Sequence, residues 1–231
     1  MPKRHGGGAR GIASIRPVTL EALIFDLDGT IADTLPIAIA SFQHTFREHL
    51  GRDYTPEEVT ALFGPSEEGI LRAQAPDRFE AVLATYLAEY ERRHACCPAP
   101  FDGLVELFDD LAGRGVRLAV VTGKGPASTA VSLRVLGLER RFATVETGSE
   151  GGFVKPDKIR GILKSWSITP ANAGYVGDHP LDMQGAHEVG TLALAAAWSP
   201  TTQPETLAAE HPHQLFHTVG ELAAWTRQAG D

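Results

Sequence analysis

The stretch Leu23–Thr30, with the sequence LIFDLDGT, constrains the fold of this chain more than any other segment. Its apolar first half predicts a buried strand, and two aspartates follow where that strand would end. Gly29 then allows a sharp turn of the backbone. Asp26 and Asp28 are so close in sequence that their carboxylates would repel each other without a nearby cation. A hard divalent ion with oxygen ligands, most plausibly Mg²⁺, would relieve this repulsion and leave one carboxylate as a nucleophile.

Helical periodicity and short apolar runs alternate along the second half of the chain. The predicted helices cover residues 104–115, 126–136, 157–166 and 181–189, and the predicted strands cover 116–121, 142–146, 174–176 and 192–197. Such alternation indicates parallel strands joined by crossover helices. The predicted fold class is therefore α/β, with a Rossmann-like parallel sheet as its core.

A purely helical segment separates the first strand from this alternating region. Apolar residues recur at intervals of three and four over residues 35–50, a capping box starts at Thr55, and two further helices are predicted over residues 66–74 and 77–90. The prolines and glycine of residues 98–103 mark the return to the sheet. We therefore predict a small helical cap domain, residues 35–100, inserted after the first strand of a core that comprises residues 18–34 and 101–231.

Composition excludes several classes of protein. The 231 residues are 43% hydrophobic, which suffices for a packed core, and the formal net charge of −8 disfavours a nucleic-acid partner. No apolar run is long enough to span a membrane. The two adjacent cysteines would make a strained disulfide, which favours a cytoplasmic location. Residues 1–17 are rich in Gly and Arg without an apolar signal core, so we expect a disordered extension there. The sequence does not predict an oligomeric state.

Polar motifs follow several of the predicted strands at their carboxyl ends. Asp26 and Asp28 follow the first strand, Thr122 and Gly123 follow the second, and Asp178 follows a later one. Ligands of parallel α/β sheets bind at this edge. The sequence therefore predicts one polar site that combines these side chains.

These residue types match the needs of phosphoryl transfer, which are a nucleophile, an acid, a metal and partners for the phosphoryl oxygens. We expect Asp26 to attack phosphorus and form an aspartyl-phosphate, while Asp28 protonates the leaving group and then activates water. The Thr122 hydroxyl and nearby backbone N–H groups would bind the phosphoryl oxygens. Lys155, just ahead of a predicted helix, would neutralise them, and Asp178 would hold Mg²⁺.

The four polar segments resemble the four ordered motifs of the haloacid dehalogenase (HAD) superfamily, namely Asp26-Leu27-Asp28-Gly29-Thr30, Val121-Thr122-Gly123, Lys155-Pro156 and Gly177-Asp178-x3-Asp182. The helical insert resembles the C1 cap of phosphoglycolate phosphatase-like members. This resemblance implies a Mg²⁺-dependent phosphatase that hydrolyses a small phosphorylated metabolite. It also implies that the Asp28 backbone carbonyl is a metal ligand, with Asp182 as a direct or indirect one.

Two alternatives stay open. A phosphosugar mutase of the same superfamily would use basic cap residues to grip both ends of a bisphosphate, and the absence of lysine between Lys3 and Lys124 weakens this option. A non-catalytic phospho-acceptor or binding module would keep Asp26. Such a module does not need the acid Asp28, because it expels no alcohol.

The arginines of the cap are candidates for substrate selection. We single out Arg72, since a guanidinium there would bind a substrate carboxylate or second phosphate bidentately. The complete set of predicted site residues is Asp26, Asp28, Thr122 and Lys155 for catalysis, Thr122, Gly123, Lys155 and Arg72 for substrate binding, and Asp26, Asp28, Asp178 and Asp182 for the metal.

Overall fold

The computed structural model describes residues 19–229, so the extension predicted for residues 1–17 lies outside the described part. Six parallel strands form one sheet in the order β3-β2-β1-β4-β5-β6. The strands are β1 Ala22–Phe25, β2 Arg117–Val121, β3 Thr144–Glu146, β4 Ala173–Gly177, β5 Leu192–Ala196 and β6 Gln214–Phe216. The predicted α/β fold class with a Rossmann-like parallel core is confirmed.

Strand β1 lies in the middle of the sheet, between β2 and β4. All four of its residues are buried, with Leu23 and Phe25 in the larger apolar cluster and Ala22 and Ile24 in the smaller one. This alternation shows that the strand is covered on both faces, as in other parallel sheets. The residues that follow Phe25 therefore emerge at the centre of the carboxyl edge.

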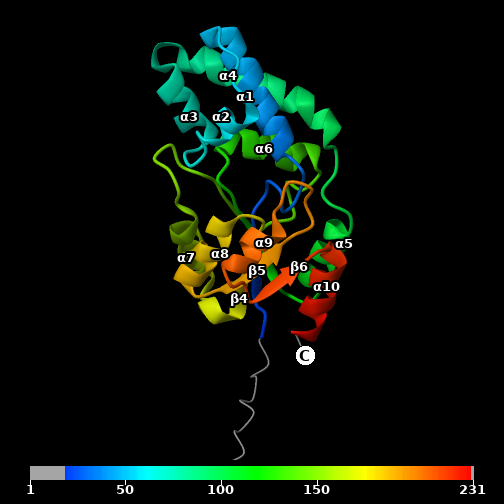
Figure 1. Cartoon of the computed structure of the whole chain (residues 1–231). Coiled ribbons are helices and arrows are strands. Elements are labelled where there is room, and N and C mark those ends of the chain that lie inside the picture. Colours follow the sequence, from blue (N-terminus) through cyan, green and yellow to red (C-terminus); the bar gives the residue numbers. More distant parts are fainter. Residues whose placement is uncertain (1–18, 230–231) are drawn as a thin grey trace, which may run out of the picture.

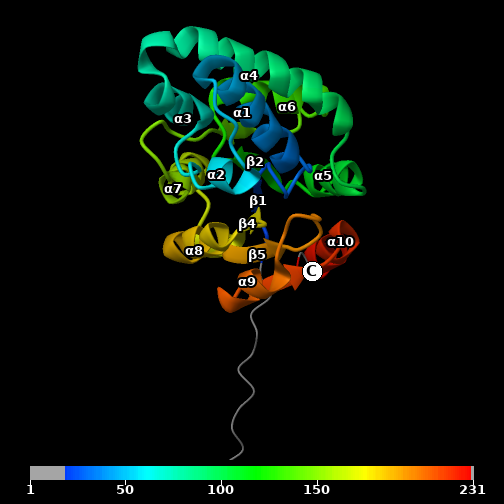
Figure 2. The ribbon, with the colours of Figure 1, turned by 45° about the horizontal axis from the view of Figure 1, so that its top comes forward.

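Helices cover both faces of the sheet (Figure 2). The larger apolar cluster takes in α5 and α10 on one face, and the smaller takes in α7 and α8 on the other. These helices and the remaining ones of the core are α5 Leu104–Gly113, α6 Pro126–Val135, α7 Lys155–Trp166, α8 Pro180–Val189, α9 Pro204–Ala209 and α10 Val219–Gln228, with a 3₁₀ turn, η3, at Pro170–Asn172.

Four helices between β1 and α5 lie together beyond the carboxyl edge of the sheet, at the top of Figure 1. They are α1 Leu35–Leu50, α2 Pro56–Thr60, α3 Glu67–Gln74 and α4 Phe79–Arg93, with 3₁₀ turns η1 at Pro76–Arg78 and η2 at His94–Cys96. The helix predicted over 35–50 is confirmed, and the capping box at Thr55 is present with both of its hydrogen bonds. Residues 35–100 remain our proposed limits for the cap.

The structure differs from the sequence prediction in two places. Lys155 and Pro156 are the first residues of α7 rather than residues ahead of it, because proline is favoured in the first turn of a helix. The region after residue 200 adds α9, β6 and α10, for which no elements were predicted. Strand β6 has only three residues, too few for a recognisable alternation of apolar and polar side chains.

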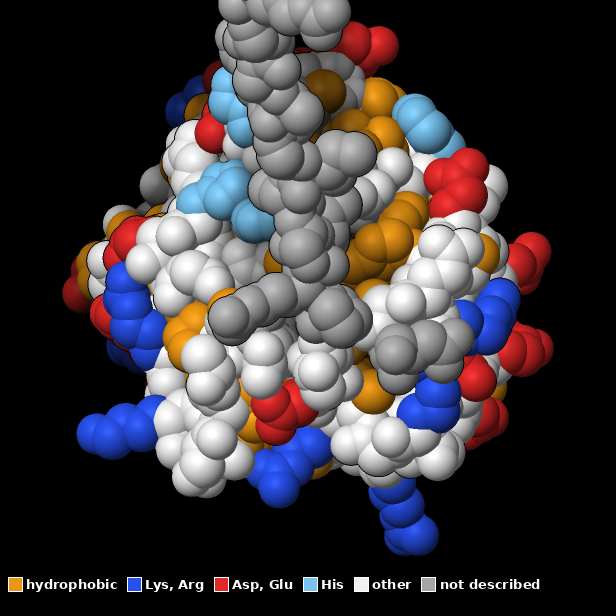
Figure 3. Space-filling model, turned by 90° about the horizontal axis from the view of Figure 1, so that it is seen from below, with side chains coloured by type: hydrophobic (Ala, Val, Ile, Leu, Met, Phe, Trp, Pro, Cys, Tyr) orange, Lys and Arg blue, Asp and Glu red, His pale blue; other side chains and the backbone are white. Residues whose placement is uncertain are grey.

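The surface shows mixed charge on the face opposite the cap. Lys and Arg side chains lie around its rim with Asp and Glu side chains between them (Figure 3). Within residues 19–229, no helix combines the length and the apolar character that crossing a membrane requires.

One ion-pair cluster in the cap leads to a stability prediction. The carboxylate of Glu89 on α4 is 7% exposed and accepts hydrogen bonds of 2.7 Å from Arg92 and Arg93. The hydrogen bonds from Arg92 hold the pKa of Glu89 at about 2, below its usual 4.5. Because the folded state has the lower pKa, this stabilisation is present above pH 4.5 and is lost as the pH falls toward 2.

We expect Glu89→Gln to lower the free energy of unfolding by about 1–2 kcal/mol at pH 7, since the partly solvated arginines weaken the pair. The difference from the wild type should shrink as the pH falls from about 4.5 toward 2, as urea denaturation would measure. Glu91→Gln is the matched control, because the Glu91–Arg134 pair is about half exposed. A difference for Glu89→Gln that did not change with pH would contradict this assignment.

Candidate active site

Asp26 lies at the centre of the carboxyl edge, directly after β1. Its backbone N–H donates to the Val176 carbonyl at 2.9 Å, which continues the pairing of β1 with β4. The side chain is buried, and its Oδ1 accepts from the Leu27 N–H at 2.7 Å. The strand thus fixes both the position and the rotation of this carboxylate.

Lys155 neutralises part of the charge at this edge. Its Nζ lies 2.7 Å from Asp26 Oδ2 and 2.7 Å from Asp182 Oδ1. Burial alone would lower the pKa of Lys155, but the two carboxylates outweigh it and hold that pKa well above its usual range. Burial likewise raises the pKa of Asp26 to about 7, although the ammonium of Lys155 opposes the shift. Lys155 is therefore a fixed cation that contacts the predicted nucleophile.

Asp182 is held from several sides. Besides Lys155, the Tyr175 hydroxyl lies 3.2 Å from its Oδ1, and its Oδ2 accepts the His179 N–H at 3.1 Å in the first turn of α8. The same hydroxyl donates to the Val121 carbonyl at 2.9 Å. These contacts link the ends of β2 and β4 to α8.

Asp178 follows β4 and lies opposite the turn that leaves β1. The Thr30 hydroxyl donates to its Oδ1 at 3.1 Å. A Cβ at position 29 would collide with its carboxylate, and Gly29 also has a φ of +73°, so both space and backbone conformation require glycine there. Burial raises the pKa of Asp178 well above its usual range, and the neighbouring Asp26 and Asp182 add to the shift.

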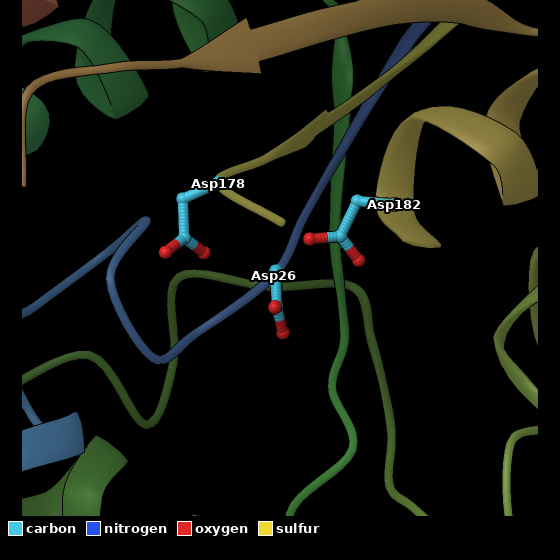
Figure 4. A group of neighbouring side chains, drawn as sticks. All are labelled: Asp26, Asp178 and Asp182. Carbon is cyan, nitrogen blue, oxygen red and sulfur yellow. The ribbon is translucent and has the colours of Figure 1, made fainter. Parts of the chain in front are cut away.

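Three of the predicted metal residues come together. Asp26, Asp178 and Asp182 each offer a carboxylate oxygen, and these oxygens all lie within 4.8 Å of one another (Figure 4). Their only cationic contact among residues 19–229 is Lys155, so the three carboxylates, when ionised, exceed it by two negative charges. Hard oxygen donors with this excess charge fit a divalent cation such as Mg²⁺.

Asp28 points away from this group. Its Oδ1 accepts a hydrogen bond from the Thr34 hydroxyl and lies 3.3 Å from the ammonium of Lys124. The Gly29 turn thus separates the two aspartates of the motif, so that the Asp28 carboxylate is not among the three clustered carboxylates. A metal contact through the Asp28 backbone carbonyl stays a prediction.

Thr122 and Gly123 lie at the end of β2, as expected. Thr122 is buried, and its hydroxyl accepts the Lys124 N–H at 3.2 Å. A side chain at Gly148 would collide with the Gly123 carbonyl, so the loops after β2 and β3 are packed tightly here. The structure brings both residues to the predicted edge, and their contact with a phosphoryl group stays a prediction.

Arg72 takes part in a contact between cap and core. Its guanidinium donates to both carboxylate oxygens of Glu150, at 2.8 and 3.3 Å, and lies 3.6 Å from the centre of the Phe79 ring. The side chain is 49% exposed. Its predicted role as a substrate ligand stays a prediction, and would require the guanidinium to leave Glu150.

The charged residues that join Asp28 to the cap were not predicted. Lys124 lies beside Asp28, and Glu67 of α3 reaches it from the cap at 3.1 Å. The sequence could have identified Lys124 as a site residue, because it is adjacent to the predicted Gly123 and is the first lysine after Lys3. Glu67 gave no comparable signal, since an acidic residue in the first turn of a helix is common for local reasons.

Comparisons with known proteins identify the family of this chain. Residues 23–196 match the family model described as haloacid dehalogenase-like hydrolase. The chain is 28% identical over 208 residues to the pyrophosphatase PpaX of Bacillus pumilus, covering 89% of this chain and 96% of the relative. It is 31% identical over 182 residues to the tyrosine-protein kinase PtkA of Mycobacterium bovis, covering 77% of this chain and 62% of the relative.

Among solved structures, a predicted phosphoglycolate phosphatase of Haemophilus somnus has a TM-score of 0.72 with 19% identity, covering 90% of this chain and 98% of that chain. At this sequence identity, the similarity shows that the two proteins share a fold. The family match covers most of the chain, so the chain belongs to the haloacid dehalogenase-like hydrolases. The prediction of a hydrolase acting on phosphoric monoesters is thereby confirmed at the level of the family.

The carboxylate cluster leads to a prediction about metal binding. We expect Asp178→Ala to weaken Mg²⁺ binding by at least about tenfold, because one of three oxygen donors and one of the unbalanced charges are removed. Isothermal titration with Mg²⁺ measures this without turnover. Asp77→Ala, at an exposed aspartate in the cap, is the matched control. Equal Mg²⁺ affinity of the two variants would rule out Asp178 as a ligand.

Proposed function

We propose that this hydrolase is a Mg²⁺-dependent phosphatase of the phosphoglycolate phosphatase-like subgroup, which cleaves a small phosphorylated metabolite through an aspartyl-phosphate intermediate. The observation that carries the proposal is the buried Asp26 carboxylate, which lies 2.7 Å from Lys155 and within a cluster of three carboxylates. A carboxylate fixed in this way is suited to nucleophilic attack on phosphorus.

In the first half of the reaction, a carboxylate oxygen of Asp26 forms a bond to phosphorus. The bond between phosphorus and the leaving oxygen breaks, and Asp28 donates its proton to that oxygen. The Thr122 hydroxyl and neighbouring backbone N–H groups orient the phosphoryl oxygens, while Lys155 offsets their charge. The separation of Asp28 from Asp26 supports two distinct roles for these carboxylates.

In the second half, water attacks phosphorus and Asp28 accepts its proton. The bond between Asp26 and phosphorus breaks, which releases inorganic phosphate. Asp26, Asp178 and Asp182 would hold Mg²⁺, which would offset the charge of the phosphoryl group when bound. The Asp28 carbonyl is a further proposed ligand.

A phosphate-release screen tests the proposal against its alternatives. Purified protein is assayed with small phosphorylated metabolites, pyrophosphate and p-nitrophenyl phosphate, each with and without Mg²⁺. Conversion of a hexose monophosphate to an isomer without free phosphate would identify a phosphosugar mutase. Absence of metal-dependent phosphate release from every compound would favour a phospho-acceptor or binding module.

The nucleophile gives the first catalytic prediction. We expect Asp26→Asn to lower kcat by at least about a thousandfold with the fold intact, because the amide has the same shape but is a far weaker nucleophile. The rate of p-nitrophenyl phosphate hydrolysis and the circular dichroism spectrum measure the two effects. A variant that kept about a tenth of wild-type turnover would exclude covalent catalysis by Asp26.

The acid gives the second catalytic prediction. Asp28→Asn should slow the hydrolysis of glycerol 3-phosphate at least about tenfold more than that of p-nitrophenyl phosphate, because p-nitrophenol departs with little protonation. The ratio of kcat values for the two substrates, compared with the wild type, is the measurement. Equal losses for both substrates would remove Asp28 from the acid role.

A further inference from the structure

A buried lysine joins the predicted acid to the cap. The Lys124 ammonium lies 3.3 Å from Asp28 Oδ1, 3.1 Å from Glu67 Oε1 and 4.4 Å from the centre of the Tyr90 ring. Its side chain is only 3% exposed. Asp28 and Lys124 come from core loops, whereas Glu67 and Tyr90 come from cap helices, so the contact exists only while the cap lies against the core.

Glu67 is held in this place by the core as well as by its own helix. It accepts hydrogen bonds from the Gly125 N–H and from the Ser128 hydroxyl, the latter at 2.7 Å. Burial would raise the pKa of Glu67, but Lys124 and these donors outweigh it and hold the pKa below its usual range. Glu67 is therefore a fixed negative charge inside the closed site.

Glu68 brings a second carboxylate to the same loop. Its Oε2 is buried, and no hydrogen-bond partner for it lies within residues 19–229. A Cβ at Gly125 would overlap this carboxylate as it lies, so the Glu68 side chain packs directly against the loop at Gly125. Together, the Glu67 and Glu68 carboxylates place more negative charge on this side of the site than Lys124 balances, even when Asp28 carries the proton that it donates.

The leaving group of the substrate must lie on this side. Asp28 can protonate the leaving oxygen only within hydrogen-bond reach, so the leaving group lies beside Asp28 and hence beside Lys124. The Lys124 ammonium is already paired with the Glu67 carboxylate and lies beside the acid Asp28. An anionic leaving group would have to displace Glu67 from it or accept repulsion from Glu67 in a buried setting.

We propose that Glu67 is a specificity-determining residue, which selects phosphomonoesters whose leaving group is uncharged or cationic and rejects those with a second anion. This inference rests on the proposed phosphatase function and narrows its substrate class. Sugar-like or amino-alcohol phosphates would be accepted. Phosphoglycolate and pyrophosphate, whose leaving groups are anionic, would be poor substrates.

Three phosphomonoesters with two-carbon leaving groups test the proposal. They are 2-hydroxyethyl phosphate, O-phosphoethanolamine and 2-phosphoglycolate, whose leaving groups are neutral, cationic and anionic. Full-length protein with Mg²⁺ is assayed for kcat/KM on each, with p-nitrophenyl phosphate as the reference. We expect the wild type to prefer the neutral and cationic substrates over phosphoglycolate by at least about tenfold.

Glu67→Gln tests the residue itself. The substitution removes the charge and keeps the shape, so it should raise the kcat/KM ratio of phosphoglycolate to 2-hydroxyethyl phosphate about tenfold. Glu91→Gln is the matched control, because it removes a cap carboxylate that pairs with Arg134 of the core without touching Lys124 or Arg72. Its ratio should equal that of the wild type.

The outcomes separate the two proposals. A wild type that hydrolyses p-nitrophenyl phosphate but prefers phosphoglycolate, or an unchanged ratio in Glu67→Gln, would overturn the role of Glu67 and leave the phosphatase function intact. Absence of turnover with every compound would overturn both.

If Glu67→Gln does not fold, the role of Glu67 is tested by inhibition of wild-type p-nitrophenyl phosphate hydrolysis with the other compounds. We then expect phosphoglycolate to inhibit about tenfold more weakly than 2-hydroxyethyl phosphate. Equal or stronger inhibition by phosphoglycolate would overturn the proposal.

Discussion

The accumulation of negative charge at the centre of a buried sheet edge is the constraint on which the site depends. Asp26, Asp178 and Asp182 lie within a few ångströms of each other with one ammonium, that of Lys155, between two of them. Burial makes such repulsion costly, because little water remains to screen it. The same charges that would destabilise the isolated chain suit the site for a divalent cation and a phosphoryl group.

The cap contributes to this electrostatic arrangement through one short helix. Helix α3 contacts the loops after β2 and β3, with the Ser66 N–H donating to the Ser149 carbonyl at 2.8 Å and Glu67 bound to Lys124 and Ser128. Gly69 of α3 packs against the backbone of Glu150, where a side chain would obstruct the contact. The cap therefore does more than exclude water, because it adds charge next to the predicted acid.

The sequence predicted those parts of the site that follow from strand ends. Asp26 and Asp178 could be predicted because parallel strands bring their carboxyl ends to one edge, whereas Lys155 was predicted from the resemblance of its motif. The direction of the Asp28 side chain could not, since it depends on the turn at Gly29 and on the partner Lys124. The short strand β6 was missed for want of periodicity, whereas helix α1 matched its predicted limits because sixteen residues carry a clear pattern.

The geometry of α3 also bears on the two hypotheses about anionic substrates. Glu67 and Arg72 are five residues apart, so they lie about 140° apart around the helix axis and cannot face the same loop. While the Glu67 carboxylate pairs with the Lys124 ammonium, the Arg72 guanidinium pairs with the Glu150 carboxylate. For Arg72 to bind an anion beside Asp28, its guanidinium would have to leave Glu150, and that anion would still lie next to the buried Glu67 carboxylate. Binding of a second anion by Arg72 and its rejection by Glu67 are therefore opposite predictions for the closed site.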